Sequence, residues 1–550
     1  MSIAPDLAAT VRDWIAIDPD PETRAELEGM LARGEGDLLA ERFSGRVAFG
    51  TAGLRSGMYG GPTGMCRLVV RQAAAGIARH LLAGIPDART RGVVVTCDAR
   101  HKSDVFARDA AEVVAAHGIP VTLGDRPWPT PVGVFAVRHL AAAAAIVITA
   151  SHNPASDNGM KLFMGDGAQI APPTDEAVAA CIDAVVADGV ILPPGEAAAI
   201  VPLQPDVVEA YRSAVLARVP SPVVEIPIAM SAMHGVGGAL LRDLLHAAGH
   251  RAVTVVAEQH DPDPDFPTVS FPNPEEAGAT DLLIAEMART GAILGLALDP
   301  DADRIAVCVA DGDHHRQLTG DEVGALLGEW LLSEVTVGDD RLVITTVVSS
   351  SRLQKIAARH GAHFEQTLTG FKWLARAALG APHLRQVIAY EEAIGYAVGS
   401  DVFDKDGIGA ALAVASMTSA YTARGITLIE KLDELDRTYG AHVTGNFSLR
   451  YEGIGWRERR DATVARLVAA PPTHIGSATV EHVELLAPDV LRVELGDGVR
   501  VIVRPSGTEP KLKCYCEAVE PAPDADAAAA RGRATERLSA LRTALETMLS

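Results

Sequence analysis

Residues 92–123, GVVVTCDARHKSDVFARDAAEVVAAHGIPVTL, decide the fold class. An apolar run (VVVTC) leads into a polar turn, then a helical stretch that begins at Ser103 and ends near Gly118, then a second apolar run (VTL). Two strands joined through a helix form a β-α-β unit, and such units build parallel sheets. The stretch therefore predicts an α/β protein.

Strands that end in polar loops recur along the chain, which indicates several domains. A length of 550 residues is too great for one compact core, because domains usually hold roughly 100–200 residues. We place boundaries near residues 211, 318 and 440. The predicted domains are therefore 1–211, 212–318, 319–440 and 441–550.

Composition limits the partners and the compartment. Lys plus Arg number 49 against 71 Asp plus Glu, which gives a net charge of −22, and such a field repels nucleic acid and anionic lipid. The first residues lack the pattern of a signal peptide, and no apolar stretch approaches the roughly 20 residues needed to span a bilayer. Six cysteines without a C-x-x-C pair suit a reducing compartment. We expect a cytoplasmic protein with neither a nucleic-acid nor a membrane partner.

The segment DPDADR contains Asp299, Asp301 and Asp303, which alternate between two apolar runs. In an extended chain such residues share one side, so their carboxylates can converge. At about 5 Å they repel by roughly 3 kcal/mol per pair at an effective dielectric constant of about 20, a cost that a bound cation removes. Oxygen ligands favour Mg²⁺ or Mn²⁺. A calcium loop is excluded by Arg304 at its sixth position and Ala310 at its twelfth, while a solvated acidic turn remains an alternative.

We assign no metal ion to two other polar clusters. Asp261, Asp263 and Asp265 repeat the same spacing in HDPDPDFP, where alternating prolines and the lack of a nearby arginine favour a rigid surface loop. His314 and His315 follow two aspartates in a predicted hairpin turn, where solvation is the simpler interpretation.

Ser151, His152 and Asn153 follow the apolar run AAAAAIVIT and therefore lie at the carboxyl end of a predicted strand, where open α/β sheets bind ligands. They offer a hydroxyl nucleophile, a proton carrier and an amide, and Lys161 lies ten residues further on. A simple turn is the alternative. No G-x-S-x-G motif surrounds Ser151, which disfavours a Ser-His-Asp hydrolase.

The segment 504–511, RPSGTEPK, brings donors together around a glycine. Backbone N–H groups in such loops can bind phosphate, and an arginine adds bidentate recognition. A basic turn is the alternative. The glycines around Arg55 do not match a dinucleotide or P-loop spacing, so nucleotide binding is not supported.

Taken together, five motifs resemble those of the α-D-phosphohexomutases. They are FGTAGLR (49–55), TASHNP (149–154), DPDADR (299–304), EEAIG (391–395) and RPSGTEPK (504–511). GFKW (370–373) and DKDG (404–407) look closest to the branch that holds phosphoglucomutase 2 and phosphopentomutase. The resemblance implies four domains around a central cleft, three similar α/β domains and a smaller C-terminal α+β domain.

The resemblance also implies roles in catalysis. Ser151 would be the phosphoserine, and one of its phosphate oxygens would bind Mg²⁺ together with the three aspartates of the DPDADR segment. Arg55 and Arg304 would stabilise charge near the transferring group. Lys161 or His152 would act as general acid and base.

The remaining motifs imply substrate contacts. Glu391 and Glu392 would bind sugar hydroxyls. The phosphate that is not reacting would be held by Arg504, Ser506, Gly507 and Thr508, with Lys372 as a helper. The implied substrate is a hexose or pentose phosphate, with glucose 1,6-bisphosphate as primer and intermediate, and the implied assembly is a monomer or a small homo-oligomer.

The identity of the sugar stays open at this stage. Ala393 stands where many hexomutases have Ser, and Val348 stands where bacterial mannose/glucose enzymes have Lys. Phosphoglucomutase is the leading hypothesis, and phosphomannomutase and phosphopentomutase are its rivals. A phosphatase and a non-catalytic sugar-phosphate sensor are less favoured alternatives.

Overall fold

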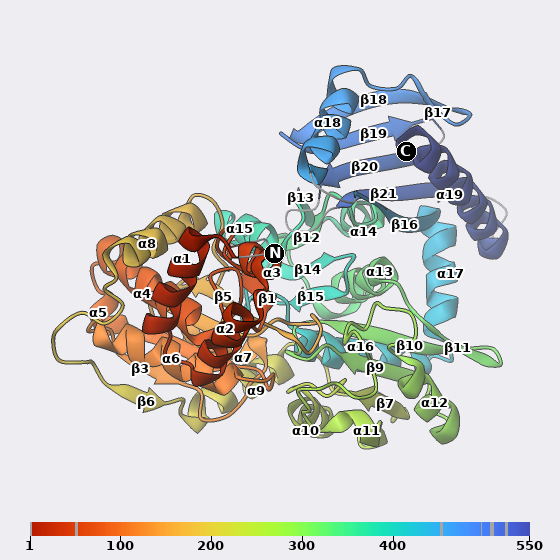
Figure 1. The fold of residues 1–550 in the computed structure, drawn as a ribbon. Helices are drawn as coiled ribbons and strands as arrows, with labels where there is room; N and C mark the ends of the chain where they lie inside the picture. Colours follow the sequence, from red (N-terminus) through yellow and green to blue (C-terminus); the bar gives the residue numbers. More distant parts are fainter. Residues whose placement is uncertain are drawn as a thin grey trace. The chain divides into compact units, whose positions relative to one another are not determined.

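The computed structural model describes residues 3–49, 53–451, 455–496, 498–505, 511–522 and 526–549. The chain forms two compact units, which are described separately. Unit 1 comprises Met1–Gln317 and Gly395–Ser416, and unit 2 comprises Leu318–Ile394 and Met417–Ser550. Figure 1 labels their helices and strands.

The first sheet of unit 1 confirms the predicted β-α-β unit. Its order is β1-β5-β4-β2-β3-β6, and β2 pairs in parallel with both β3 and β4, whereas β5 is antiparallel to β4 and β1. The strands are β1 (Leu54–Gly57), β2 (Val93–Cys97), β3 (Val121–Leu123), β4 (Ala144–Ile148), β5 (Asp157–Met164) and β6 (Ile200–Pro202). The helices are α4 (Arg67–Gly84), α5 (Ala88–Arg91), α6 (Ser103–Ala116), α7 (Thr130–His139) and α8 (Thr174–Asp188).

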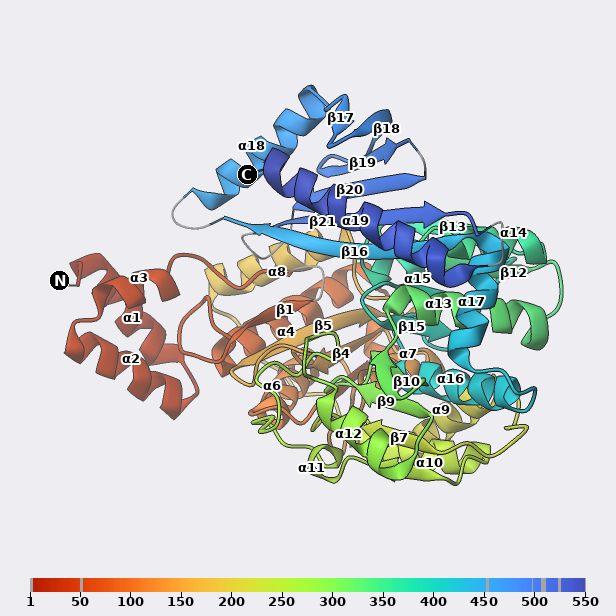
Figure 2. The same ribbon diagram turned by 90° about the vertical axis from the view of Figure 1, so that its right-hand side faces the viewer.

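Three helices precede this sheet and were not predicted. They are α1 (Pro5–Ile17), α2 (Pro21–Arg33) and α3 (Gly36–Arg42). Figure 2 shows them gathered together, and they bury a small core of their own that includes Val11, Leu27 and Leu39. The N-terminal segment is therefore a packed helical group and not a tail.

The second sheet of unit 1 has the order β11-β10-β9-β7-β8. Its strands β7 (Ile228–Ser231), β8 (Val253–Val255) and β9 (Leu294–Leu298) are parallel, and β10 (Ile305–Asp311) and β11 (His314–Gln317) continue it antiparallel. Its helices are α9 (Pro205–Ala217), α10 (Gly238–Ala248), α11 (Ala257–His260) and α12 (Asp281–Thr290). The acidic segment DPDADR connects β9 to β10, as predicted.

Three of the four strands of the third sheet lie in unit 2, where β12 (Arg341–Thr346) pairs in parallel with β13 (His363–Thr367) and β14 (Arg385–Glu391). The surrounding helices are α13 (Gly320–Trp330), the π-helix η1 (Leu331–Val335), α14 (Arg352–His360), α15 (Phe371–Gly380) and α17 (Leu428–Tyr439). The chain passes through β15 (Gly395–Val398) in unit 1, and α16 (Gly407–Thr422) leads back to unit 2.

The last sheet, also in unit 2, has the order β16-β21-β20-β19-β18-β17 and is antiparallel. Its strands are β16 (Ala441–Arg450), β17 (His474–Ile475), β18 (Ala478–Ala487), β19 (Val490–Leu495), β20 (Val499–Pro505) and β21 (Lys511–Glu520). Helices α18 (Trp456–Ala469) and α19 (Ala527–Leu549) pack on the face that carries Val501 and Val503. Because side chains alternate along a strand, Arg500, Ile502 and Arg504 lie on the opposite face.

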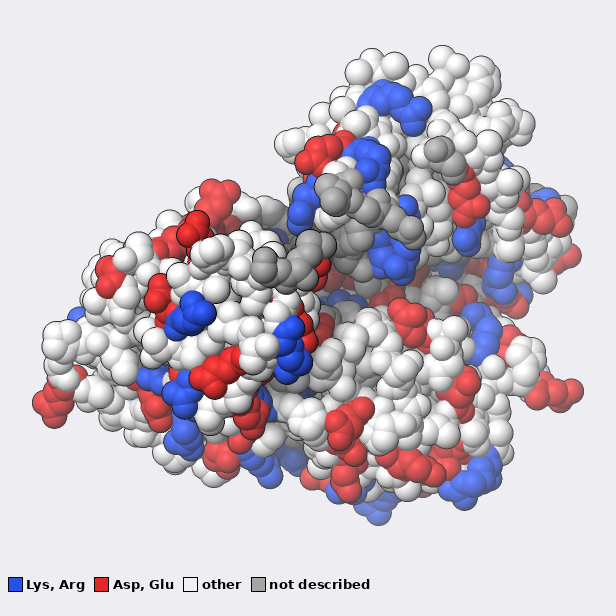
Figure 3. All heavy atoms as spheres, viewed as in Figure 1, with Lys and Arg blue, Asp and Glu red and all other residues white. Residues whose placement is uncertain are grey.

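The predicted fold class is confirmed: three α/β sheets precede an antiparallel α+β portion. Each sheet falls within one predicted domain, and the exact boundaries remain predictions. In the described residues no helix is long and apolar enough to cross a membrane. The six cysteines are free thiols. On the face drawn in Figure 3, acidic and basic side chains are interspersed.

One close backbone contact in unit 1 yields a stability prediction. A Cβ added at Gly235 would lie 2.4 Å from the Cα and the carbonyl oxygen of Pro300, which belongs to the acidic loop. We expect Gly235→Ala to lower the free energy of unfolding by about 1–3 kcal/mol, because the packed backbone must shift. Urea denaturation measures it.

Gly84→Ala is the matched control, since a Cβ at this end of α4 would meet no atom within 4 Å. This control should be neutral or stabilising by up to about 1 kcal/mol. Equal unfolding curves for the two variants would contradict the close contact.

Candidate active site

The loop after β4 places Ser151 at the carboxyl end of a buried strand, as predicted. Ser151 is 1% exposed and has φ +53°, in the left-handed region. The Ser151 N–H donates a hydrogen bond to the Thr149 hydroxyl at 2.8 Å. The Ser151 hydroxyl donates to Asp299 Oδ2 at 2.9 Å and lies 3.2 Å from His152 Nδ1. The serine is therefore in direct contact with the acidic loop.

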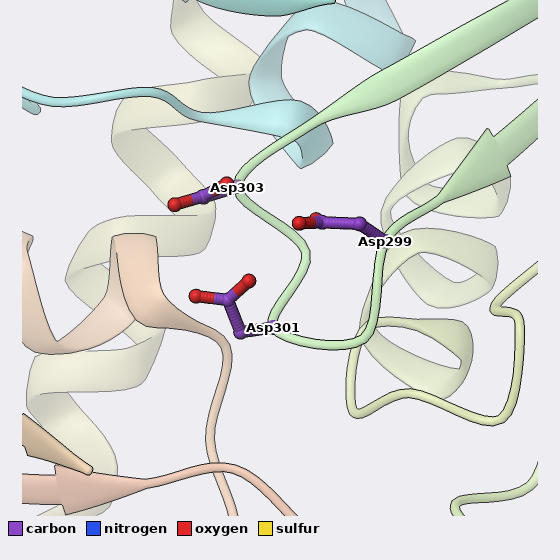
Figure 4. Close-up of side chains that lie close together, drawn as sticks. All are labelled: Asp299, Asp301 and Asp303. Atoms are coloured by element: carbon purple, nitrogen blue, oxygen red, sulfur yellow. The ribbon is translucent and has the colours of Figure 1, made fainter. Parts of the chain in front are cut away.

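Asp299, Asp301 and Asp303 converge, and ligand oxygens of all three lie within 4.8 Å of one another. Figure 4 shows their carboxylates facing one another from one loop. The convergence was predicted from alternation along an extended chain, and this reason was wrong, because the segment forms a turn. Ala302 has φ +58°, and its N–H donates to the Asp299 carbonyl at 2.9 Å. The turn, not strand alternation, brings the carboxylates together.

Positive and polar side chains from distant segments surround these aspartates. Lys161 Nζ, on β5, lies 2.7 Å from both Asp301 Oδ2 and Asp303 Oδ2. The Thr130 hydroxyl, at the start of α7, donates to Asp301 at 2.5 Å. Lys405 Nζ lies 3.3 Å from Asp303 Oδ2. No role was predicted for Lys405, although its DKDG motif was a usable signal.

The three carboxyl groups ionise differently. Burial and the charges of Asp301 and Asp303 raise the pKa of Asp299 well above its usual value. Burial also opposes ionisation of Asp301, but the Lys161 ammonium and the Thr130 hydroxyl outweigh it and lower that pKa. Burial lowers the pKa of Lys161, but the charges of Asp301 and Asp303 outweigh this effect and raise it above its usual value. The Lys161 ammonium therefore persists at neutral pH.

The donor set fits a divalent cation. All three aspartates are 0% exposed, and Asp301 Oδ1 accepts no hydrogen bond from the described residues. Carboxylate and hydroxyl oxygens are the ligands that Mg²⁺ and Mn²⁺ prefer. Asp299, Asp301, Asp303 and Ser151 could therefore hold such an ion.

Arg55, Arg304 and His152 complete the cluster in unit 1. Arg55 Nη1 donates to the Asn153 side chain at 3.4 Å, and the Arg304 N–H donates to Asp299 Oδ1 at 3.0 Å. Burial, Arg304 and Arg55 lower the pKa of His152 well below its usual value. The imidazole is therefore neutral at physiological pH.

The predicted sugar-binding residues lie in unit 2. Glu391 Oε1 accepts from the Gly370 N–H at 2.7 Å, just before α15 and Lys372, which is 8% exposed. Glu392 Oε2 accepts from the Thr346 and Ser349 hydroxyls, both at 3.3 Å. The protein thus orients both carboxylates.

Arg504, at the end of β20, donates to the Tyr515 hydroxyl at 3.1 Å. Burial lowers its pKa, but Tyr515, Glu392 and Glu391 together raise it above the usual value. The structure thus brings Arg504 near both glutamates. Ser506, Gly507 and Thr508 lie outside the described residues.

The structure also describes the two polar clusters to which no metal ion was assigned. Asp261 and Asp265 are exposed, and His314 begins β11 after a tight turn. Among the described residues, the three buried aspartates are the only group suited to a metal ion.

Four family domains match along the chain. Residues 46–187, 209–312 and 319–438 match the alpha/beta/alpha domains I, II and III of phosphoglucomutase/phosphomannomutase, and residues 458–533 match its C-terminal domain. The chain belongs to the phosphoglucomutase/phosphomannomutase family. The resemblance to the α-D-phosphohexomutases is confirmed.

Relatives of the family match most of the chain. A Haemophilus influenzae protein named "Probable phosphomannomutase" is 38% identical over 83% of this chain and 93% of its own. A Schizosaccharomyces pombe protein named "Probable phosphoribomutase" is 34% identical over 93% of each. A Burkholderia thailandensis family structure, 22% identical, superposes with a TM-score of 0.68 over 90% of this chain and 97% of that one. The chain is thus an enzyme of the mutase class.

The geometry predicts how Mg²⁺ binding responds to substitution. Asp301→Asn should weaken Mg²⁺ binding by about tenfold or more, because it removes one negative charge from the cluster. Isothermal titration with MgCl₂ measures the affinity.

Asp261→Asn is the control, since it removes an exposed charge from the other D-x-D-x-D segment. The Mg²⁺ affinity of Asp261→Asn should equal that of the wild type. Equal weakening in both variants would mean that net charge, and not the buried cluster, governs binding.

Proposed function

We propose that this enzyme moves a phosphoryl group between two positions of a sugar phosphate, with Ser151 as the phosphate carrier. The observation that carries the proposal is the 2.9 Å contact between the Ser151 hydroxyl and Asp299 within the buried carboxylate cluster. A nucleophilic hydroxyl beside a cation site, with two lysines and two arginines nearby, suits phosphoryl transfer.

The chain's own residues supply charge and proton transfer. Bound Mg²⁺, held by the three aspartates and an oxygen of phospho-Ser151, would neutralise phosphate charge. Arg55 and Arg304 add positive charge at the transferring group. His152, held neutral, accepts the proton of the attacking sugar hydroxyl. Lys161, held protonated, acts as general acid and donates a proton to the seryl oxygen as its bond to phosphorus breaks.

The transfer then runs twice. Phospho-Ser151 gives its phosphoryl group to the free hydroxyl of a sugar monophosphate, which yields a bisphosphate and free serine. The other phosphoryl group of that bisphosphate then returns to Ser151, and the isomeric monophosphate leaves. Glucose 1,6-bisphosphate serves as primer because it can phosphorylate an empty Ser151.

The remaining predicted residues bind the substrate. Glu391 and Glu392 accept hydrogen bonds from sugar hydroxyls. Arg504, Ser506, Gly507 and Thr508 hold the phosphate that is not reacting, with Lys372 as a helper, since an arginine beside backbone N–H groups recognises phosphate.

We take glucose 1-phosphate as the leading substrate. The names of the two relatives favour mannose and ribose phosphates as second candidates. A cytoplasmic location, a monomer or small homo-oligomer, and the absence of nucleic-acid and membrane partners belong to the same proposal.

The carrier is tested in a coupled assay of glucose 1-phosphate isomerisation with Mg²⁺ and a trace of glucose 1,6-bisphosphate. Ser151→Ala should lower kcat at least about 1,000-fold, because the phosphate acceptor is lost. The control is Ser156→Ala, an exposed serine on the same loop that should retain wild-type turnover. Wild-type turnover by Ser151→Ala would sink the carrier assignment.

The sugar is tested by comparing kcat/KM for the 1-phosphates of glucose, mannose and ribose. We expect glucose 1-phosphate to give the highest value. If kcat/KM for ribose 1-phosphate were about tenfold higher than for glucose 1-phosphate, which corresponds to about 1.4 kcal/mol of transition-state stabilisation, the preferred substrate would be a pentose phosphate.

A further inference from the structure

Arg100 lies directly beneath the Ser151 loop and is 3% exposed. Its Nη2 donates to the carbonyls of Ser151 at 2.6 Å and Asn153 at 2.5 Å. Its Nη1 donates to the carbonyls of Pro154 at 2.7 Å and Asp157 at 3.2 Å. A single guanidinium therefore holds the backbone of the loop at four points.

Two further contacts fix the guanidinium itself. Its Nε lies 3.4 Å from Asp98 Oδ2, and the other Asp98 oxygen accepts from the Ser103 hydroxyl at 2.6 Å. The Phe266 ring covers it, with Arg100 Cζ 4.9 Å from the ring centre. Phe266 comes from the proline-rich segment after α11, to which the proposed reaction assigns no part.

The Ser151 backbone needs such support. Its φ of +53° is disfavoured for a residue with a Cβ. Strained conformations of this kind persist where surrounding contacts over-determine them. The bond from Arg100 to the Ser151 carbonyl is one such contact.

We propose that Arg100 is a positioning residue for phosphoryl transfer. It holds Ser151 in the left-handed conformation that directs Oγ to Asp299, and it acts through the backbone without touching substrate. This inference rests on the proposed role of Ser151. A planar fork of donors can serve several carbonyls at fixed angles, which the point charge of lysine cannot do.

The test is the Arg100→Ala enzyme in the coupled assay. We expect kcat to fall about 100-fold while KM stays within about threefold, because the carrier is misplaced and the substrate contacts remain. Added guanidinium chloride at millimolar concentration should restore turnover at least about tenfold by filling the vacated site, whereas equal NaCl or urea should not.

Arg91→Ala is the matched control. Arg91 also donates to backbone carbonyls, those of Ala141 and Ala142, but at the opposite end of β4 from Ser151. Its kcat should stay near that of the wild type, and guanidinium should not raise it. An equal loss in both variants, or a loss in Arg100→Ala that guanidinium does not relieve, would reduce Arg100 to a structural role and overturn the inference.

Arg100→Lys serves if the alanine variant does not fold. It keeps the charge beside Asp98 but loses the fork, so kcat should fall about tenfold or more with KM within about threefold. Wild-type kcat in a folded Arg100→Lys enzyme would overturn the inference.

Mass spectrometry separates this inference from the proposed function. Wild-type enzyme treated with glucose 1,6-bisphosphate should carry phosphate on Ser151, and Arg100→Ala should acquire it more slowly at unchanged Mg²⁺ affinity. No phosphate on wild-type Ser151 would overturn the carrier and the inference with it. Rapid labelling in both enzymes would overturn the role of Arg100 alone.

Discussion

Asp299, Asp301 and Asp303 bring three buried carboxyl groups close together. At separations near 5 Å, each ionised pair costs roughly 3 kcal/mol at an effective dielectric constant of about 20. Lys161 meets two of the aspartates at 2.7 Å, and Lys405 and Thr130 add further contacts. These partners come from the first sheet, from the start of α7 and from the segment after β15. The folding of unit 1 thus depends on balancing charge at this one point.

Backbone strain gathers around the same point. Ser151 and Ala302 both adopt left-handed conformations, and the acidic loop runs against Gly235 so closely that no Cβ would fit. Such strain is stored at functional sites and held by the surrounding structure. The carboxylates and the serine can meet only because both loops turn sharply.

The sequence predicted what short-range patterns encode. The strand before Ser151 and the β-α-β unit follow from hydrophobic runs and turn residues, which act locally. The convergence of the aspartates was also predicted, although through strand alternation where a left-handed Ala302 is responsible. Arg100 and Lys405 were missed because their partners are backbone carbonyls or carboxylates far along the chain. Pairing of that kind is set by tertiary packing and leaves no periodic signal.

Sugar preference is the property least accessible to such patterns. Glucose and mannose differ in the direction of one hydroxyl, so discrimination depends on where a few acceptor oxygens point. In unit 2 the Gly370 N–H orients Glu391, and the Thr346 and Ser349 hydroxyls orient Glu392. Ala393, which follows the two glutamates, has a methyl side chain and offers no hydroxyl. In the proposed site the loops around the two glutamates fix their carboxylates, so we expect the geometry of those loops, as well as the glutamates themselves, to set the sugar preference.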